Sequence, residues 1–178
     1  MSPEYKYIVP LTGAASQGRE ELGGKAFNLQ RLMEANFHVP GGFVVTARAF
    51  REVVAKIVAD GGGWDGIDRM SELVCNVRLP RLMADEILSA AATLRTITGP
   101  ALVVRSSATT EDLENSSMAG QAASFANVVT DDALLQAIKG CWASLFTRET
   151  ITYHSSQSPA GGFPEMAVVV QQLVPAYR

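Results

Sequence analysis

Apolar residues recur along this chain with two spacings, one typical of amphipathic helices and one typical of short buried strands. The helical spacing places Phe27, Leu29, Leu32 and Met33 on one face of a predicted helix. It predicts helices over six stretches, which are residues 25–36, 46–59, 68–77, 81–97, 133–145 and 148–155. Short apolar runs predict five strands, which are residues 5–11, 43–45, 102–105, 124–129 and 166–174.

Glycine, proline and small polar residues separate these elements. Loops are predicted where such residues cluster, at 12–24, 39–42, 61–63, 98–100 and 155–164. Thr46 and Thr130 stand directly before helical patterns, where a hydroxyl side chain is a favoured N-cap. The strands 102–105 and 124–129 enclose the longest connection that is rich in small residues.

Composition limits the class of protein. The chain has 178 residues, which suits one domain or two small lobes, and its 47% hydrophobic content supports a core. A net charge of −3 and a pI near 5.4 argue against a nucleic-acid ligand. Cys75 and Cys141 lack metal-ligand spacing, so two reduced, buried thiols in a cytoplasmic protein are expected. No signal peptide or membrane-spanning run is predicted.

The strongest chemical signal is an arginine at the end of an apolar strand. Arg105 follows the run 101–104, hydroxyl residues come next, and Gly120 lies further along the same segment. A guanidinium matches phosphate oxygens two at a time, and a glycine lets backbone N–H groups approach them. The residues therefore suit a polyphosphate. The alternative is a surface arginine paired with Glu111 or Asp112.

Five segments in order resemble the nucleotide-binding domain shared by phosphoenolpyruvate synthase, pyruvate phosphate dikinase and rifampicin phosphotransferase. These segments are residues 22–29, 39–46, 105–121, 141–147 and 167–175. The resemblance implies an α+β fold, the N-terminal lobe of an ATP-grasp-like domain with a mixed sheet and flanking helices. Residues 1–178 would form the first part of that domain. The second lobe, which carries acidic metal ligands, and a phosphohistidine domain would lie elsewhere in the same chain or in a partner.

The resemblance also assigns roles to individual residues. Lys25 and Arg105 would clamp ATP phosphates, with Arg105 also offsetting charge during transfer, and Gly120 and Ser124 would cover them. For Lys25 the residues alone favour an ordinary lysine at a helix start.

Two residues of the last strand would hold the base. Gln171 would reach the adenine, and the backbone near Leu173 would pair with the base edge. A buried glutamine needs a hydrogen-bond partner, and a neighbouring backbone carbonyl would serve as well as an adenine.

The activity implied by the resemblance is phosphoryl transfer with ATP and Mg²⁺. ATP would phosphorylate a histidine of a swivelling domain, giving AMP and phosphate, and the phosphoryl group would pass to pyruvate or an antibiotic hydroxyl. We expect residues 1–178 alone to bind ATP weakly without turnover. The alternative is a non-catalytic nucleotide-binding or regulatory module that pairs with a partner chain. Ala123 favours it mildly, because many relatives carry an acidic residue there.

Overall fold

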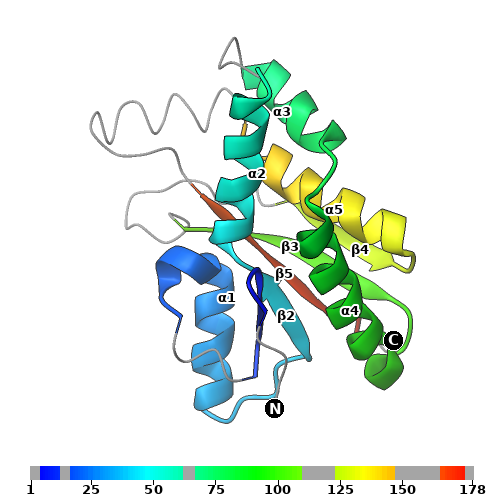
Figure 1. Cartoon of the computed structure of the whole chain (residues 1–178). Helices are drawn as coiled ribbons and strands as arrows, with labels where there is room; N and C mark the ends of the chain where they lie inside the picture. Colours follow the sequence, from blue (N-terminus) through cyan, green and yellow to red (C-terminus); the bar gives the residue numbers. More distant parts are fainter. Residues whose placement is uncertain (1–4, 13–16, 62–66, 110–122, 147–164, 175–178) are drawn as a thin grey trace.

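A computed structural model describes residues 5–12, 17–61, 67–109, 123–146 and 165–174 (Figure 1). The chain has an α+β fold, as predicted. The described residues form five helices, which are α1 (Arg19–Glu34), α2 (Ala47–Ala59), α3 (Ile67–Asn76), α4 (Arg81–Thr98) and α5 (Asp131–Ala143). The predicted helix 148–155 lies outside the described residues.

The described strands form one five-stranded sheet with the order β1-β2-β5-β3-β4. Its members are β1 (Ile8–Pro10), β2 (Gly42–Val45), β3 (Leu102–Ala108), β4 (Ser124–Val128) and β5 (Met166–Gln172). Every neighbouring pair is antiparallel, so the expected mixed sheet is wrong for the part of the chain described. The reason is the place of β5. β2 and β3, which helices α2, α3 and α4 connect, run parallel to each other. β5 lies between them and runs antiparallel to both, so they do not pair directly.

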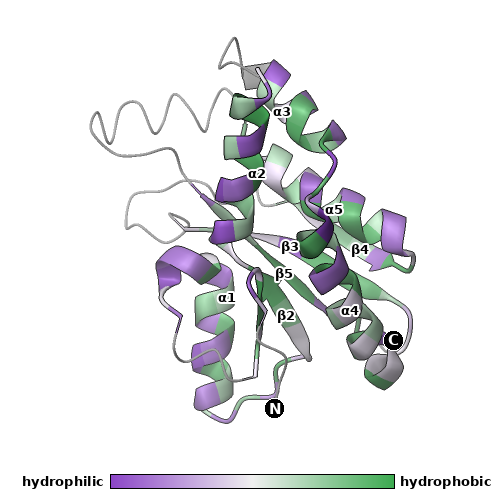
Figure 2. Cartoon of the chain, in the orientation of Figure 1, coloured by the Kyte–Doolittle hydropathy of each residue, from purple (hydrophilic) through white to green (hydrophobic). Residues whose placement is uncertain are grey.

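Helices cover the two faces of the sheet unequally (Figure 1). One face packs against α2, α3, α4 and α5 and contains the larger core, including Phe43, Val104 and Val168. Among the described elements, α1 is the helix that packs against the other face, around Val44 and Val169. Because successive strand residues point to opposite faces, the long apolar runs of β2 and β5 supply both cores. Figure 2 shows these strands as hydrophobic, whereas the first turn of α1 is hydrophilic.

The first turn of α1 corrects a second expectation. Residues 12–24 were predicted to form a loop, but α1 begins at Arg19 and continues with a kink at Gly23 (φ 72°, ψ 169°). Glu20 and Glu21 occupy this first turn, where carboxylates are favourable because the helix dipole is positive there. The glycine pair that indicated a loop is thus accommodated inside the helix, and Lys25 lies just after the break.

Several predicted boundaries are confirmed. Thr130 Oγ1 accepts a hydrogen bond from the Ala133 amide at 3.2 Å, as expected of an N-cap. Thr46 also stands at the N-cap position of α2, but its hydroxyl makes no capping hydrogen bond. The α2 start is held instead by Glu21, whose carboxylate accepts from the Arg48 amide at 3.1 Å. Gly99 ends α4 with φ 90°.

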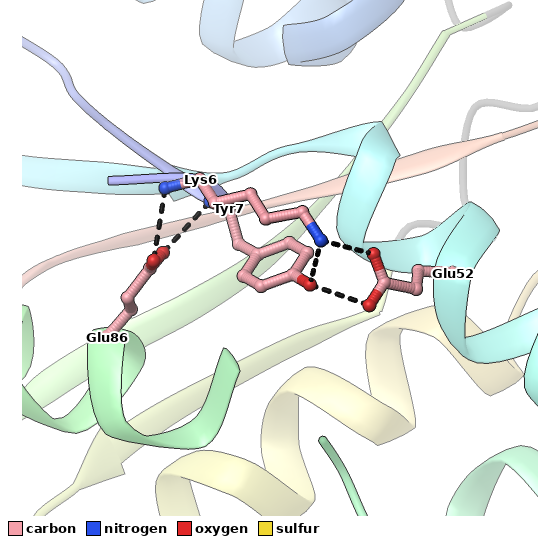
Figure 3. Close-up of polar contacts among 4 residues, drawn as sticks. All are labelled: Lys6, Tyr7, Glu52 and Glu86. Atoms are coloured by element: carbon pink, nitrogen blue, oxygen red, sulfur yellow. Dashed lines mark hydrogen bonds and ion pairs between the residues drawn. The ribbon is translucent and has the colours of Figure 1, made fainter. Parts of the chain in front are cut away.

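A group of four polar residues fastens β1 to two helices (Figure 3). The Glu86 carboxylate of α4 accepts hydrogen bonds from the Lys6 and Tyr7 amides at 3.1 and 2.9 Å. The Tyr7 hydroxyl donates to Glu52 of α2 at 2.6 Å, and Lys6 donates to both Tyr7 and Glu52. These contacts give the short edge strand β1 support beyond its pairing with β2.

Candidate functional site

The face of the sheet next to α1 carries a partly exposed arginine. Arg105 lies opposite Val169 of β5, and Val169 belongs to the apolar cluster that contains Leu22 and Ala26 of α1. Directly opposed residues of an antiparallel pair point to the same face, so Arg105 shares the face of α1. Within the described ranges, no hydrogen bond or ion pair engages its guanidinium. The proposed partners Glu111 and Asp112 lie outside those ranges.

Lys25 reaches the same strand from α1. Its Nζ donates to the Ser106 carbonyl at 2.6 Å. The Ser106 amide donates to the Ala123 carbonyl, so this part of the β3 backbone faces the start of β4. An ammonium group has three N–H donors, so the contact with Ser106 does not exclude a phosphate oxygen. The structure thus brings Lys25 to the residue directly after Arg105.

Ser124 lies opposite Arg105 in the β3–β4 register, so it points to the same face, and its side chain is exposed. Gly120 lies outside the described residues. Ala123 packs instead against the core on the opposite, helix-rich face. An acidic side chain at this position would therefore point away from Arg105.

The two predicted adenine contacts lie on β5 and just beyond it. Gln171 alternates with Val169 and so points to the α1 face, where it is buried and donates to the Pro40 carbonyl at 2.9 Å. The backbone carbonyl considered above as a partner is thus present. The Leu173 amide donates to the Ala101 carbonyl at 3.1 Å, so a base would find this N–H already engaged.

Ser107 was not singled out by the sequence, yet it joins α1 to β3. Its hydroxyl donates to the Leu22 carbonyl at 2.9 Å and accepts from the Ala26 amide at 3.1 Å. The side chain is completely buried. The sequence shows a hydroxyl residue two positions after Arg105. Its hydrogen-bond partners lie about eighty residues earlier in the chain, and hydrophobic periodicity cannot predict a contact over that separation.

A second group that sequence reasoning missed lies where α1 and α2 begin. Arg51 of α2 forms ion pairs with Glu21 of α1 and with Glu165, just before β5. The Glu165 carbonyl accepts hydrogen bonds from the Thr109 amide and hydroxyl at 3.0 and 3.2 Å. The group therefore ties the end of β3 and the start of β5 to the two helices beside the Gly23 kink.

The two cysteines differ in exposure. Cys141 is buried, as expected, whereas Cys75 is partly exposed, so the expectation of two buried thiols is wrong for Cys75. Neither cysteine forms a disulfide. Burial raises the pKa of Cys141 to about 12, although the nearby positive charge of Lys25 lowers it somewhat. The Cys141 thiol therefore stays protonated near neutral pH and is a poor nucleophile.

No group of three or more histidine, cysteine, aspartate or glutamate side chains in the described part of the chain is arranged to hold a metal ion. None of the helices there is long and apolar enough to cross a membrane. The chemistry that the described residues offer is cationic and hydrogen-bonding, on the sheet face next to α1.

Comparison with known proteins identifies the family of this chain. Residues 19–178 match the family model described as pyruvate phosphate dikinase, AMP/ATP-binding domain. A rifampicin phosphotransferase of a Streptomyces species is 35% identical over 185 residues, covering 95% of this chain and 21% of the relative. The phosphoenolpyruvate synthase of Aeropyrum pernix is 34% identical over 172 residues, covering 86% of this chain and 21% of the relative.

A third relative is the prodigiosin-synthesizing transferase of Serratia marcescens, 30% identical over 171 residues, covering 95% of this chain and 19% of the relative. The chain thus spans about a fifth of the length of these relatives. The family match covers most of the chain, including α1, β3 and β5 with the residues described above. By this match, the chain belongs to the pyruvate phosphate dikinase AMP/ATP-binding domain family.

Proposed function

We propose that this chain is the ATP-binding lobe of a dikinase-type phosphotransferase, and that ATP phosphates bind on the sheet face covered by α1. The observation that carries the proposal is the placement of Arg105, Lys25 and Ser124. Three separate elements bring two cations and a hydroxyl to the middle of β3 on this face, because the strand predicted to end at Arg105 continues to Ala108. A guanidinium and an ammonium beside a break in a helix are suited to phosphate oxygens.

Each residue would make a distinct contribution. Arg105 would bind phosphate oxygens through paired N–H donors and offset the negative charge that develops on them during transfer. Lys25 would add a second positive charge from the helix side. Ser124 and Gly120 would cover the phosphates. Phosphoryl transfer relies largely on such positioning and charge stabilisation, which side chains fixed on strands and helices provide.

The adenine would lie toward the far end of β5, near Gln171 and Leu173. Gln171 donates one of its two N–H groups to Pro40, and its carbonyl oxygen would accept from the base amino group. The Leu173 amide would have to exchange Ala101 for the base, whereas its carbonyl has no backbone partner among the described residues. The base is therefore expected to contact a carbonyl here first.

Mg²⁺ would enter with the nucleotide, and its protein ligands would come from residues other than those described. The described residues hold no group of three or more histidine, cysteine, aspartate or glutamate side chains placed to bind an ion, and Mg²⁺ at a nucleotide commonly uses only one or two carboxylates together with the phosphates. We therefore assign no step at this site to the ion.

The wider reaction would follow the family pattern. ATP would phosphorylate a histidine of a swivelling domain, giving AMP and phosphate, and that histidine would pass the phosphoryl group to an acceptor. The relatives are named for rifampicin, phosphoenolpyruvate and prodigiosin, although this segment is similar in all three. Such variety suggests that acceptor choice belongs to other parts of those proteins. The second lobe and the phosphohistidine domain would thus be partners of this one.

The test is calorimetric titration of this chain with ATP and Mg²⁺, beside Arg105→Ala and Arg81→Ala. Arg81 is a matched control, because its side chain is 95% exposed and it lies on α4, on the opposite face. We expect weak binding, in the micromolar-to-millimolar range, because without the second lobe one side of the nucleotide would be open to water, which screens the phosphate contacts. Arg105→Ala should weaken it at least tenfold through the loss of a charge-assisted contact. Arg81→Ala should leave it unchanged.

Equal affinity of the wild type and Arg105→Ala would contradict the assignment of Arg105. No binding by this chain would call for the same titration on a longer chain that includes the segment following residue 178. Binding only by the longer chain would show that both lobes are needed. No binding by either would reject ATP as the ligand. Phosphotransfer by residues 1–178 alone would contradict the expectation that this lobe is inactive by itself.

A further inference from the structure

The hydroxyl group of Ser107 bridges the break in α1. At the kink, the ordinary helical hydrogen bonds are interrupted, because Gly23 has non-helical dihedral angles. Ser107 Oγ donates to the carbonyl before the break, on Leu22, and accepts from the amide after it, on Ala26. A single side chain from β3 thus satisfies backbone groups on both sides of the kink. Buried backbone groups of this kind require partners, so the contact holds the kink in place.

Backbone contact at the kink is equally close. A Cβ atom at Gly23 would lie 2.0 Å from the Ser107 carbonyl oxygen and 2.5 Å from its Oγ. The segment Gly23–Gly24–Lys25 therefore rests directly on the β3 backbone, with no side chain between them. A shift of β3 or of the kink would break the hydrogen bonds and the contact together.

Three consecutive residues of β3 consequently organise the cationic end of the site. Arg105 presents its guanidinium on the α1 face, Ser106 offers the carbonyl that binds Lys25 Nζ, and Ser107 fixes the turn from which Lys25 projects. The separation between the two cations is thus set by one short piece of strand. Paired phosphate oxygens need such a fixed spacing, because each misplaced donor loses much of its hydrogen-bond energy.

Resting on the proposed function above, we propose that Ser107 is a positioning residue for the phosphate end of the ATP site. Its hydroxyl keeps the Gly23–Gly24–Lys25 turn against β3, so that Lys25 and Arg105 act on the same phosphate group or on neighbouring ones. Ser107 itself does not touch the nucleotide, because it is fully buried and its hydroxyl is engaged on both sides.

The first test is made without nucleotide, on the wild type and Ser107→Ala. Hydrogen exchange at the Ala26 amide and the acylation rate of Lys25 Nζ are measured by mass spectrometry. Loss of the hydroxyl should speed exchange at Ala26 at least tenfold and raise Lys25 acylation severalfold, because the turn leaves the strand. Unchanged values of both would overturn the inference, whether or not the chain binds ATP.

The second test separates positioning from a merely structural role. ATP and adenosine are titrated into both proteins, and into Ile87→Val, whose altered side chain lies in the core of the opposite face. Ser107→Ala should bind ATP about three- to tenfold more weakly, with adenosine affinity unchanged, since only phosphate contacts are displaced. Ile87→Val, destabilised without change at the kink, should match the wild type for both ligands.

Equal losses for ATP and adenosine, or normal ATP affinity despite faster exchange at Ala26, would reduce Ser107 to a structural residue and refute the proposal. Ser107→Thr retains the hydroxyl. If it folds, it should restore slow exchange and ATP affinity together, and restoration of only one would also count against the proposal. Absence of ATP binding by the wild type would contradict the proposed function. The exchange and acylation rates would still decide whether Ser107 holds the turn against β3.

Discussion

The two faces of the sheet differ in what covers them and in what they expose. Four helices bury one face in a continuous core that includes Trp142, Phe50 and Phe146, whose aromatic rings are in contact. In the part of the chain described, the other face has one helix and a small apolar cluster, and it also carries Arg105 and Ser124. One face is therefore built mainly for stability, and the other keeps polar side chains available.

The same strand serves both purposes. In β3, Leu102 and Val104 point into the large core, whereas Arg105 and Ser107 point toward α1. Burial of the apolar side chains fixes the strand, and the fixed strand then holds the polar ones at set positions. The contrast predicts that substitutions on the helix-rich face change stability, while those on the α1 face change ligand affinity.

The largest effect is expected on the helix-rich face. Trp142→Ala removes a fully buried indole and should lower the free energy of unfolding by about 3–5 kcal/mol. Denaturant unfolding followed by circular dichroism measures it. Within the described residues, the Trp142 Nε1 has no hydrogen-bond partner, so Trp142→Phe, which also removes this unsatisfied donor, should cost clearly less. A loss of equal size in both variants would contradict this account.

A smaller effect is expected at the kink on the α1 face, as the difference in stability between two glycine variants, roughly 1–3 kcal/mol. Gly23→Ala places a side chain in a backbone region that is essentially glycine-only, which lowers the free energy of unfolding by about 1–3 kcal/mol. The new Cβ also overlaps Ser107, which lowers it by roughly a further 1–3 kcal/mol. Gly99→Ala is the matched control, because Gly99 has similar angles (φ 90°, ψ 173°) but nothing within 4 Å of its Cβ position. Thermal or urea unfolding of both variants isolates the contact with β3. Indistinguishable stabilities would show that the kink does not rest on β3 in solution.

The smallest effect is expected at the edge strand. Tyr7→Phe removes the hydrogen bond to Glu52 and should cost about 0.5–1.5 kcal/mol at pH 7. Burial, followed by the bond to Glu52, raises the pKa of Tyr7 above its usual 10.0. The unfolded state therefore loses this proton first, and wild-type stability should fall as the pH rises above about 10.

Hydrogen bonds from Tyr7 and Lys6 lower the pKa of Glu52 below its usual 4.5, so its contribution should disappear as the pH falls below that value. Urea titrations at several pH values measure both effects. Lys6, whose pKa is also raised, remains in the variant. Tyr7→Phe should thus show a shallower, though not flat, alkaline decline, and an unchanged decline would assign the effect to other groups. ATP affinity should match the wild type, because Tyr7 belongs to the opposite core.

Local sequence patterns predicted most elements, because each depends on neighbours within a few residues. The helix of residues 81–97 and the cap at Thr130 follow from apolar spacing and side-chain chemistry that act over one or two turns. The start of α1 was missed because a glycine pair normally ends a helix. Here a hydrogen bond from a distant strand residue supports the break. The resemblance, rather than the pattern alone, indicated the family and the candidate residues.

By itself, the sequence determined the alternation of helices and strands, the positions of Lys25, Arg105 and Ser124 along the chain, and the family. Only the tertiary structure decided that β5 lies between β2 and β3, and that this register turns Arg105, Ser124 and Gln171 toward α1. It also revealed Ser107 as the link between α1 and β3. The physical reason is that strand pairing and helix docking join residues far apart in the chain, and their energy depends on geometry that no local pattern encodes.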